Sequence, residues 1–549
     1  MKKVFIYFIS LVLSFGSIAQ STLITPGDNQ PNIIASGTNN GGITPPRMTS
    51  AQIAAIVAPV EGSIVYDTDI NCLRLFDGIS WKCQSENSDY VISGQNPYGI
   101  GNDEARDLAI FGEFVYVVGY FENSISFSTV PSTTLTTTNK STYIAKYSKD
   151  GFCYWAKKID GNAVPNSITT DENGNVYVGG SFLTAINFNP GFELGIGFRD
   201  LYIAKYTSSG SLLWGKTFGS TQADSLFDVA VDRLENLYVT GNFKSTIDFN
   251  GSQAGGNYSS QGGKDIFIAR FNSATGAFIS AKTTGLNCDE SGTALFVDNS
   301  NNLYATGIAK DTVRFDNLAI GREVIKLPGL GTQVVYLQGY VAKFNSNFDC
   351  IKLSKLSYPH GDKIKVRSAN VFIGSANSNI LAGPCHMFDV FHAGMTKLSE
   401  DFFGFNWVTD VYGAVEPLTV SSSKFKTMDF DVDKNGNIVL AVSREGGGSG
   451  DFGVQSYETF GYHPYYKSDA QIKLKGNDRD IIMAKYDSDF NLLEMEILKK
   501  SGDQNLWALK ISENNEIFMV GSFTVSFPLT NYTLNNNGGT DSFLIKLEK

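Results

Sequence analysis

The residues in this sequence that are best able to do chemistry form a histidine- and cysteine-containing group near position 390. Cys385, His386, Asp389 and His392 are the densest set of zinc-type ligands, but their spacing matches no standard zinc pattern. If this segment is a strand, neighbouring residues 385 and 386 point to opposite faces. The sequence also lacks the G-x-S-x-G, H-E-x-x-H and phosphate-loop motifs. We therefore predict no metal site and no catalytic residue here.

Carboxylates form a second group of candidates. Asp232, Asp298, Asp431 and Asp433 lie near short apolar runs that we expect to be innermost strands. If those strands converge, the carboxylates could meet in a central pocket and support a lyase or hydrolase. The alternative is that each aspartate caps a turn.

A third group is aromatic. Residues 444–479 include Tyr457, Tyr462, His463, Tyr465 and Tyr466. Tyrosines offer a large contact area with one polar group, which suits binding of protein or carbohydrate. The alternative is a loop that packs on itself, and the sequence leaves both interpretations open.

Two Asp-x-Asn-Gly-Asn segments, Asp171–Asn175 and Asp433–Asn437, resemble half of a calcium-binding loop. Both lack the downstream glutamate and the length of an EF-hand. A hairpin turn in which Asn and Gly adopt positive φ explains these segments better. We predict no cofactor, with calcium as the alternative that the sequence does not support.

The elements that must position these residues are short strands repeated along the chain. One strand type alternates apolar and polar residues, and its copies are Tyr143–Tyr147, Tyr202–Tyr206, Phe267–Phe271, Tyr340–Phe344, Gly394–Leu398, Ile482–Tyr486 and Phe543–Leu547. A second type usually ends in glycine, and its copies are Phe114–Gly119, Asn175–Gly179, Asn236–Gly241, Asn302–Gly307, Asn379–Gly383, Asn437–Ala441 and Glu516–Gly521. Each unit can be read as four strands, and recurrence at roughly 55 to 90 residues indicates a solenoid, propeller or array.

The two ends of the repeat region distinguish a closed ring from an open array. The last unit stops at its third strand, Phe543–Leu547, and Asp89–Gly94 resembles a fourth strand with no unit before it. If these segments pair, no sheet edge stays open. We predict an all-β fold, a seven-bladed β-propeller of four-stranded antiparallel blades over residues 89–549, closed by an N-terminal strand in the last blade.

The repeats resemble the SBBP-type β-propeller repeats of secreted bacterial proteins. The resemblance rests on the D-x-N-G-N-x-Y-V-x-G-x-F run at Asp171–Phe182, on the D-I-F-I-A-K-Y strand type and on the G-x-x-x-W-x-K strand type. It implies a propeller fold and leaves the function open. Residues 43–84 resemble a small module that precedes larger domains in exported bacterial surface proteins, through PPRMT, an EG-hydrophobic strand and DG-x-x-W. This second resemblance implies a surface location.

The N-terminal region has its own organisation. Lys2 and Lys3, an apolar run over 4–15 and small residues at 17–19 predict a signal peptide over 1–20. We expect a linker over 21–46 and a small α+β module over 47–88, with a helix over 51–57 that begins with a Thr49/Gln52 capping box. In that module we expect strands at 64–66 and 73–76, and Cys72 and Cys83 flank the hairpin as the candidate disulfide pair. The pairing of Cys153, Cys288, Cys350 and Cys385 stays open.

The net charge and the loop lengths limit the classes of function that we expect. A net charge of −11 argues against sequence-independent nucleic-acid binding, which requires a basic surface. No later stretch is long and apolar enough for a membrane span. The loops between second and third strands are long, so one face carries them and the opposite face carries tight turns. We predict an exported binding scaffold for protein or carbohydrate on the long-loop face. The alternatives are a carboxylate-dependent enzyme and a structural surface component, and the oligomeric state is open.

Overall fold

The computed structural model describes residues 45–548, apart from 69–71, 77–80, 85–90, 130, 190, 252–254, 311, 322, 328–330, 336–338, 357–361, 368–369, 376–377, 384–385, 391–392, 400–404, 412–424, 446–447, 457–464, 475–477, 489–491, 499–500 and 530–532. The predicted signal peptide therefore lies outside the described residues, as does nearly all of the predicted linker. The chain divides into two compact units, Met1–Asn87 and Ser88–Lys549. Within the described residues, no helix is long and apolar enough to cross a membrane.

The N-terminal unit is a small sheet with one short helix. Strands β1 (Arg47–Met48), β2 (Ile64–Asp67), β3 (Cys72–Phe76) and β4 (Trp81–Gln84) pair in chain order, and helix α2 (Ser50–Ala54) follows β1. The predicted strands and the capping box are confirmed, because Thr49 N donates to Gln52 Oε1 at 2.8 Å and Gln52 N donates to Thr49 Oγ1 at 3.2 Å. The helix ends at Ala54, three residues earlier than predicted, and Ala58 beyond it adopts a positive φ of 51°.

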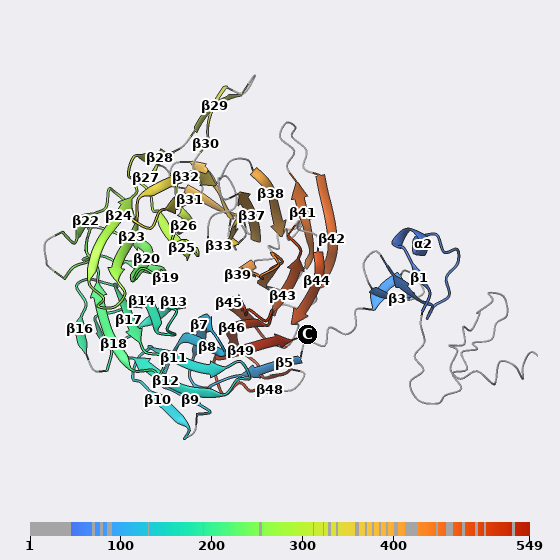
Figure 1. Cartoon of the computed structure of the whole chain (residues 1–549), viewed down its shortest axis with the longest axis horizontal. Coiled ribbons are helices and arrows are strands. Elements are labelled where there is room, and N and C mark those ends of the chain that lie inside the picture. The colour runs from blue at the N-terminus through green and yellow to red at the C-terminus, as the bar shows by residue number, and fades with distance from the viewer. Residues whose placement is uncertain are drawn as a thin grey trace, which may run out of the picture. The chain divides into compact units, whose positions relative to one another are not determined.

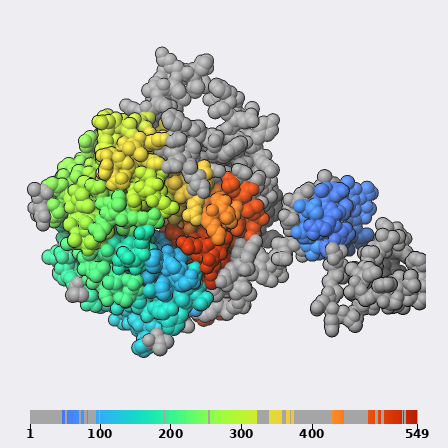
Figure 2. Space-filling model, viewed as in Figure 1, coloured from blue at the N-terminus to red at the C-terminus, as the bar shows by residue number. Residues whose placement is uncertain are grey.

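The second unit consists of antiparallel sheets arranged around a common centre (Figure 1), and colours follow one another around that centre in sequence order (Figure 2). The first strand of each sheet is innermost. These strands are β7 (Asp103–Phe111), β13 (Val164–Thr170), β19 (Ser225–Val231), β25 (Ser291–Val297), β33 (Lys363–Arg367), β39 (Phe425–Val432) and β45 (Gln504–Ile511).

The second and third strands lie side by side in the middle of each sheet. The second strands are β8 (Phe114–Phe121), β14 (Val176–Phe182), β20 (Asn236–Phe243), β26 (Leu303–Ile308), β34 (Asn370–Ser375), β40 (Ile438–Glu445) and β46 (Ile517–Phe523). The third strands are β11 (Ser141–Ser148), β17 (Asp200–Tyr206), β23 (Asp265–Asn272), β31 (Gly339–Phe344), β37 (Ala393–Ser399), β43 (Arg479–Tyr486) and β49 (Asp541–Glu548). The third-strand predictions are confirmed.

The fourth strands are outermost in this four-strand pattern. They are β12 (Cys153–Ile159), β18 (Leu212–Phe218), β24 (Phe278–Thr284), β32 (Cys350–Leu356), β38 (Phe405–Val411), β44 (Leu492–Leu498) and β5 (Val91–Gln95). Strand β5 comes from the start of the unit and pairs antiparallel with β49, with Ile545 opposite Gly94. The innermost strands of the last and first sheets, β45 and β7, are also in contact.

The segments between second and third strands were predicted as loops, but much of their length is hairpin. The hairpins are β9 (Ser124–Phe127) with β10 (Thr133–Thr136), β15 (Ala185–Asn187) with β16 (Phe192–Leu194), β21 (Thr246–Asp248) with β22 (Asn257–Ser259), β27 (Val313–Phe315) with β28 (Leu318–Ile320), β29 (Glu323–Leu327) with β30 (Gly331–Val335), β35 (Ser378–Gly383) with β36 (His386–Val390), β41 (Gly448–Ser456) with β42 (Tyr465–Leu474), and β47 (Phe527–Pro528) with β48 (Thr533–Leu534). Strand β6 (Tyr98–Ile100) extends the first hairpin. Strand β41 also pairs with β38 and so enlarges that sheet to six strands.

One strand prediction is wrong. Asn379–Gly383 was expected to be the second strand of its unit, but it lies in hairpin strand β35, and β34 is the second strand. The physical reason is burial: Val371, Phe372 and Ile373 of β34 are at most 1% exposed and provide the apolar run that packs between sheets. The hydrophobic clusters lie between neighbouring sheets, and one of them joins Leu108 and Val117 of the first sheet to Phe518 and Leu544 of the last.

Candidate functional site: the axial cavity

The innermost strands place polar residues around the centre at two levels. On each first strand, the residue at one level lies opposite a buried, usually aromatic, side chain of the second strand. We call this level the Lys layer, and it consists of Ala109, Thr169, Ala230, Phe296, Lys365, Asp431 and Lys510. The Asp layer lies two residues earlier on each strand: Asp107, Ser167, Asp228, Ala294, Lys363, Asp429 and Ala508. Because residues two apart share a strand face, members of both layers line one cavity of about 220 Å³.

The aspartates of these layers connect neighbouring sheets. Asp107 accepts hydrogen bonds from Leu108 N at 2.8 Å and from Ile168 N of the next sheet at 2.9 Å. Asp429 does the same with Leu509 N at 2.8 Å. A carboxylate that accepts two backbone N–H bonds is well satisfied in its ionised form.

Asp228 and Asp431 follow the same pattern. Asp228 accepts from Ser167 Oγ on the preceding sheet at 2.6 Å and from Leu295 N on the following sheet at 2.8 Å. Asp431 accepts from Ile511 N at 2.8 Å. The carboxylates of the two layers, of which Asp107 and Asp228 line the cavity, therefore join neighbouring sheets.

The lysines are held less closely. Lys363 Nζ lies 3.8 Å from Asp429 Oδ1, and Lys365 Nζ lies 3.9 Å from Asp431 Oδ1. Both distances exceed the 2.7–2.9 Å that is typical of a direct charge-assisted hydrogen bond. In the described part of the chain, Lys510 makes no ion pair within 4.0 Å. Each ammonium group has three donors, so hydrogen-bonding capacity remains around the cavity.

The charged groups at the axis shift one another's pKa values. Burial opposes ionisation of Asp429, but Lys363, Lys510 and Lys365 hold its pKa below the usual range. Burial and the adjacent Lys510 lower the pKa of Lys365. Burial raises the pKa of Asp228, against hydrogen bonds from Ser167 and Leu295. Burial opposes ionisation of Lys510, but Asp429, Asp107 and Asp431 raise its pKa, so Lys365 is the one of these two lysines whose charged form is disfavoured.

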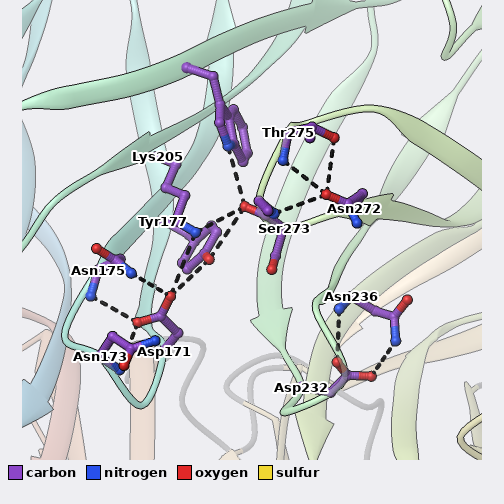
Figure 3. Close-up of polar contacts among 12 residues, drawn as sticks. Asp171, Asn173, Asn175, Tyr177, Lys205, Asp232, Asn236, Asn272, Ser273 and Thr275 are labelled. Atoms are coloured by element: carbon purple, nitrogen blue, oxygen red, sulfur yellow. Dashed lines mark hydrogen bonds and ion pairs between the residues drawn. The ribbon is translucent and has the colours of Figure 1, made fainter.

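The predicted turn caps lie outside this cavity and have their expected role. Asp171 Oδ1 accepts from Asn173 N and Asn175 N at 3.0 and 2.9 Å, and its Oδ2 accepts from Asn175 Nδ2 at 2.8 Å and from Tyr177 OH at 3.0 Å (Figure 3). Asp232, Asp298 and Asp433 repeat the bonds to the backbone and side chain of the asparagine four residues later. The turn interpretation is confirmed for these aspartates, and only Asp431 of the predicted set belongs to the axial layers.

Adjacent sheets are also joined near these turns. The Ser273 carbonyl, in the turn after β23, accepts from Lys205 Nζ at 3.1 Å and from Trp214 Nε1 at 3.3 Å (Figure 3). The Ser208 carbonyl is used in the same way by Lys146 and Trp155 of the sheet before it. The repeated Lys and Trp of the third and fourth strands therefore link each of these two sheets to the next.

Several predicted residues fall where the structure says little. Tyr457, Tyr462, His463, Cys385 and His392 lie outside the described residues, Tyr465 and Tyr466 lie in β42, and His386 and Asp389 lie in β36. Within the described residues, no group of His, Cys, Asp and Glu is arranged to hold a metal ion. Cys72 and Cys83 lie on the paired strands β3 and β4, where Arg74 is opposite Cys83, and their disulfide stays a prediction. Cys153 and Cys350 are free and buried, and Cys288 is disulfide-bonded.

The axial lysines were missed in the sequence, although a signal was present. Lys363 and Lys365 are two residues apart in the sequence, as are Asp429 and Asp431. This spacing places both members of a pair on one strand face. Nothing in the sequence places the two pairs next to Lys510, which comes from a third strand.

Comparisons with known proteins agree with this architecture. Residues 159–181 match the family model described as a β-propeller repeat, SBBP, and this segment contains most of the Asp171–Phe182 motif. Residues 25–95 match the model described as a phage tail like trimerisation region. A stretch of 117 residues, 18% of this chain, is 33% identical to an uncharacterised WD repeat-containing protein of Acanthamoeba polyphaga mimivirus, of whose length the chain spans only 8%.

Solved structures with similar backbones have low sequence identity. The WD40 β-propeller domain of Doa1 is 10% identical with a TM-score of 0.39, and the match covers 83% of this chain and 97% of that domain. A Trypanosoma rangeli sialidase in complex with sialic acid is 7% identical with a TM-score of 0.33, over 83% of this chain and 58% of the sialidase. The expected repeat type is confirmed by the family model: this chain carries a β-propeller repeat of the SBBP type.

Proposed function

We propose that this chain is a protein-interaction scaffold that binds its partner on the face formed by the inserted hairpins. The observation that carries the proposal is a run of exposed apolar side chains, which we call the apolar ladder: Phe192, Leu194, Ile196 and Phe198 are 64%, 69%, 59% and 78% exposed. Single exposed apolar residues are ordinary on protein surfaces, but a contiguous series of large ones marks an interaction site.

The ladder is held in a defined position. It begins in β16, whose pairing with β15 sets Leu194 opposite Ala185. Its second half is fixed by Asp200, whose Oδ2 accepts from Ile196 N at 2.6 Å and from Gly197 N at 3.0 Å. A fixed apolar edge loses little conformational entropy on binding, which favours association with an extended segment of a partner protein.

The architecture that we propose for this scaffold is a closed, seven-bladed propeller. The pairing of β5 with β49 and the contact of β45 with β7 support closure, because each joins the two ends of the repeat region. Closure of this kind leaves no open sheet edge between the first and last blades.

We further propose that the chain is exported and acts outside the cytoplasm, at or near the cell surface. Support comes from the sequence, in which Lys2 and Lys3 precede an apolar run and a small-residue cleavage site. The tyrosine-rich segment that contains Tyr457, Tyr462 and His463 stays a predicted second contact region, for protein or carbohydrate.

The N-terminal region is proposed to assemble the scaffold into trimers. The match of residues 25–95 to a phage tail like trimerisation region supports this assignment. A trimer would present three copies of each contact surface and raise the avidity for a repetitive partner. Light scattering of the full chain should give the mass of three chains, whereas a monomer at micromolar concentration would contradict the assignment.

The scaffold proposal can be tested with an array of extended peptides of varied apolarity. We expect the full chain to bind apolar peptides and the variant F192S/F198S to lose at least tenfold in affinity. Ile279→Ser is the matched control, because Ile279 is 43% exposed on outer strand β24, away from the ladder. Equal binding by the ladder variant and the control variant would reject the ladder as the contact site.

A further inference from the structure

We propose that the axial cavity binds a small organic carboxylate, with its oxyanion between Lys365 and Lys510 and its apolar part against β19 and β25. This inference goes beyond the scaffold function, because it concerns a small molecule at the centre and not a protein on the hairpin face. It depends on three features of the cavity: its size, its donors and its apolar wall.

The size excludes large ligands. The cavity of about 220 Å³ far exceeds the ~15 Å³ that one water molecule needs and lies below the ~300–1,000 Å³ of sites for drug-sized molecules. It opens to solvent, because the side chain of Lys365 is 18% exposed. A molecule of a few to about ten heavy atoms is therefore the right scale.

The donors select an anion. Among the residues that the structure describes, the cavity is lined by three lysines, Lys363, Lys365 and Lys510, and by only two carboxylates, Asp107 and Asp228, which accept hydrogen bonds from neighbouring sheets. Lys365 of β33 and Lys510 of β45 come from different sheets, and both line the cavity. Two adjacent ammonium groups repel one another, and an oxyanion between them relieves that repulsion while it accepts their donors.

The wall selects a ligand with an apolar body. Ala230 from β19 and Ala294, Leu295 and Phe296 from β25 line the same cavity as the lysines. An inorganic anion would leave this wall against water, whereas an aliphatic or aromatic group would cover it. A carboxylate carried on such a group satisfies both sides of the cavity.

The test is calorimetric titration of the full chain with benzoate, acetate and inorganic phosphate. We expect saturable binding of benzoate, weaker binding of acetate and phosphate, and at least a tenfold loss of benzoate affinity in Lys365→Met and Lys510→Met. Lys244→Met is the control, because Lys244 is exposed, follows the second strand β20 and does not line the cavity.

A second variant covers the case in which the lysine variants fail to fold. Phe296→Ala removes part of the wall without removing a charge, and it should weaken benzoate at least fivefold while leaving acetate unchanged. Absence of saturable benzoate binding, or equal affinity for phosphate and benzoate, would overturn the proposal. Because these measurements do not involve the apolar ladder, their failure would leave the scaffold proposal standing.

Discussion

The junction between the last sheet and the first sheet has two ends whose electrostatics are opposite. At the end near the inserted hairpins, Asp103 of β7 and Asp541 of β49 are 1% and 0% exposed and face one another. At the tight-turn end, Glu516 bridges two ammonium groups, with Lys546 Nζ at 2.8 Å and Lys149 Nζ at 3.1 Å. One junction thus contains a carboxyl–carboxyl pair and a carboxylate between two lysines.

The pKa values of the two ends move in opposite directions. Burial and the neighbouring Asp541, against hydrogen bonds from Ser542, raise the pKa of Asp103 to about 8, and burial raises that of Asp541 to about 6. Burial opposes ionisation of Glu516, but Lys546, Ser512 and Lys149 bring its pKa down to about 2. A carboxyl with a raised pKa makes stability fall as pH rises toward that pKa, and one with a lowered pKa adds stability that is lost as pH falls toward it. The difference shows that burial alone does not set the pH response of a carboxyl group, because its partners decide the sign.

The largest effect is expected from Glu516→Ala. The change leaves Lys149 and Lys546, 7% and 6% exposed, without their shared carboxylate. Lys149 keeps Glu113 at 3.2 Å, but the Asp150 that Lys546 keeps is exposed. Loss of the main partner of a buried charge costs about 3 kcal/mol, so the free energy of unfolding at pH 7 should fall by about that amount in urea titrations. A change below 1 kcal/mol would show that the tight-turn end contributes little to the junction.

The next largest effect is a gain in the free energy of unfolding, and its size depends on pH. In the wild type, stability should decline as pH rises from about 4 to about 8, because the unfolded chain releases the Asp103 proton near pH 4 whereas the native state keeps it to about pH 8. Ser542 N donates to Asp103 Oδ1 at 2.7 Å in the wild type. Asp103→Asn keeps an oxygen that can accept this hydrogen bond and removes one charge. We expect a gain of about 2 kcal/mol over wild type at pH 9 and a flat profile between pH 6 and 9. A variant whose profile declines in parallel with wild type would refute the shared-proton pair.

A smaller effect should appear at a buried carboxyl in the third sheet, whose pKa is raised by burial alone. Burial raises the pKa of Asp265, in β23, to about 6, and its Oδ2 accepts from Gln261 N at 3.1 Å. Asp265→Asn should gain about 1 kcal/mol at pH 8 and nothing at pH 3, where the carboxyl is protonated in both the native and the unfolded state. Thermal unfolding at both pH values checks this, and an equal shift at both would indicate a packing effect and not a charge effect.

The smallest effect is expected at the exposed edge of the junction. The side chain of Asp150 is 93% exposed and lies 4.0 Å from Lys546. An exposed ion pair contributes little, so Asp150→Asn should leave stability and its pH profile within about 0.5 kcal/mol of wild type. This variant is the control for the preceding ones, and a larger loss would mean that Lys546 relies on Asp150 and not on Glu516.

The sequence determined the elements that depend on short-range chemistry. Strand alternation marked the third strands, the Asp-x-Asn-Gly-Asn pattern fixed the turns that Asp171 and Asp433 cap, and the unmatched segments at the two ends of the repeat region predicted the pairing of β5 with β49. These features involve residues a few positions apart, or a count of strands, so the primary structure contains them.

The tertiary structure alone decided which distant residues share a site. Asp107 meets Ile168, Asp429 meets Leu509, and Lys365 lies beside Lys510, each across 61 to 145 positions and between sheets whose spacing the hairpin inserts vary. Local sequence sets the face on which a side chain lies, but the register of one sheet against its neighbour comes from packing of buried side chains between them. For that reason the strands could be predicted along the chain, while the axial cavity and the Asp103–Asp541 pair emerged only from the folded molecule.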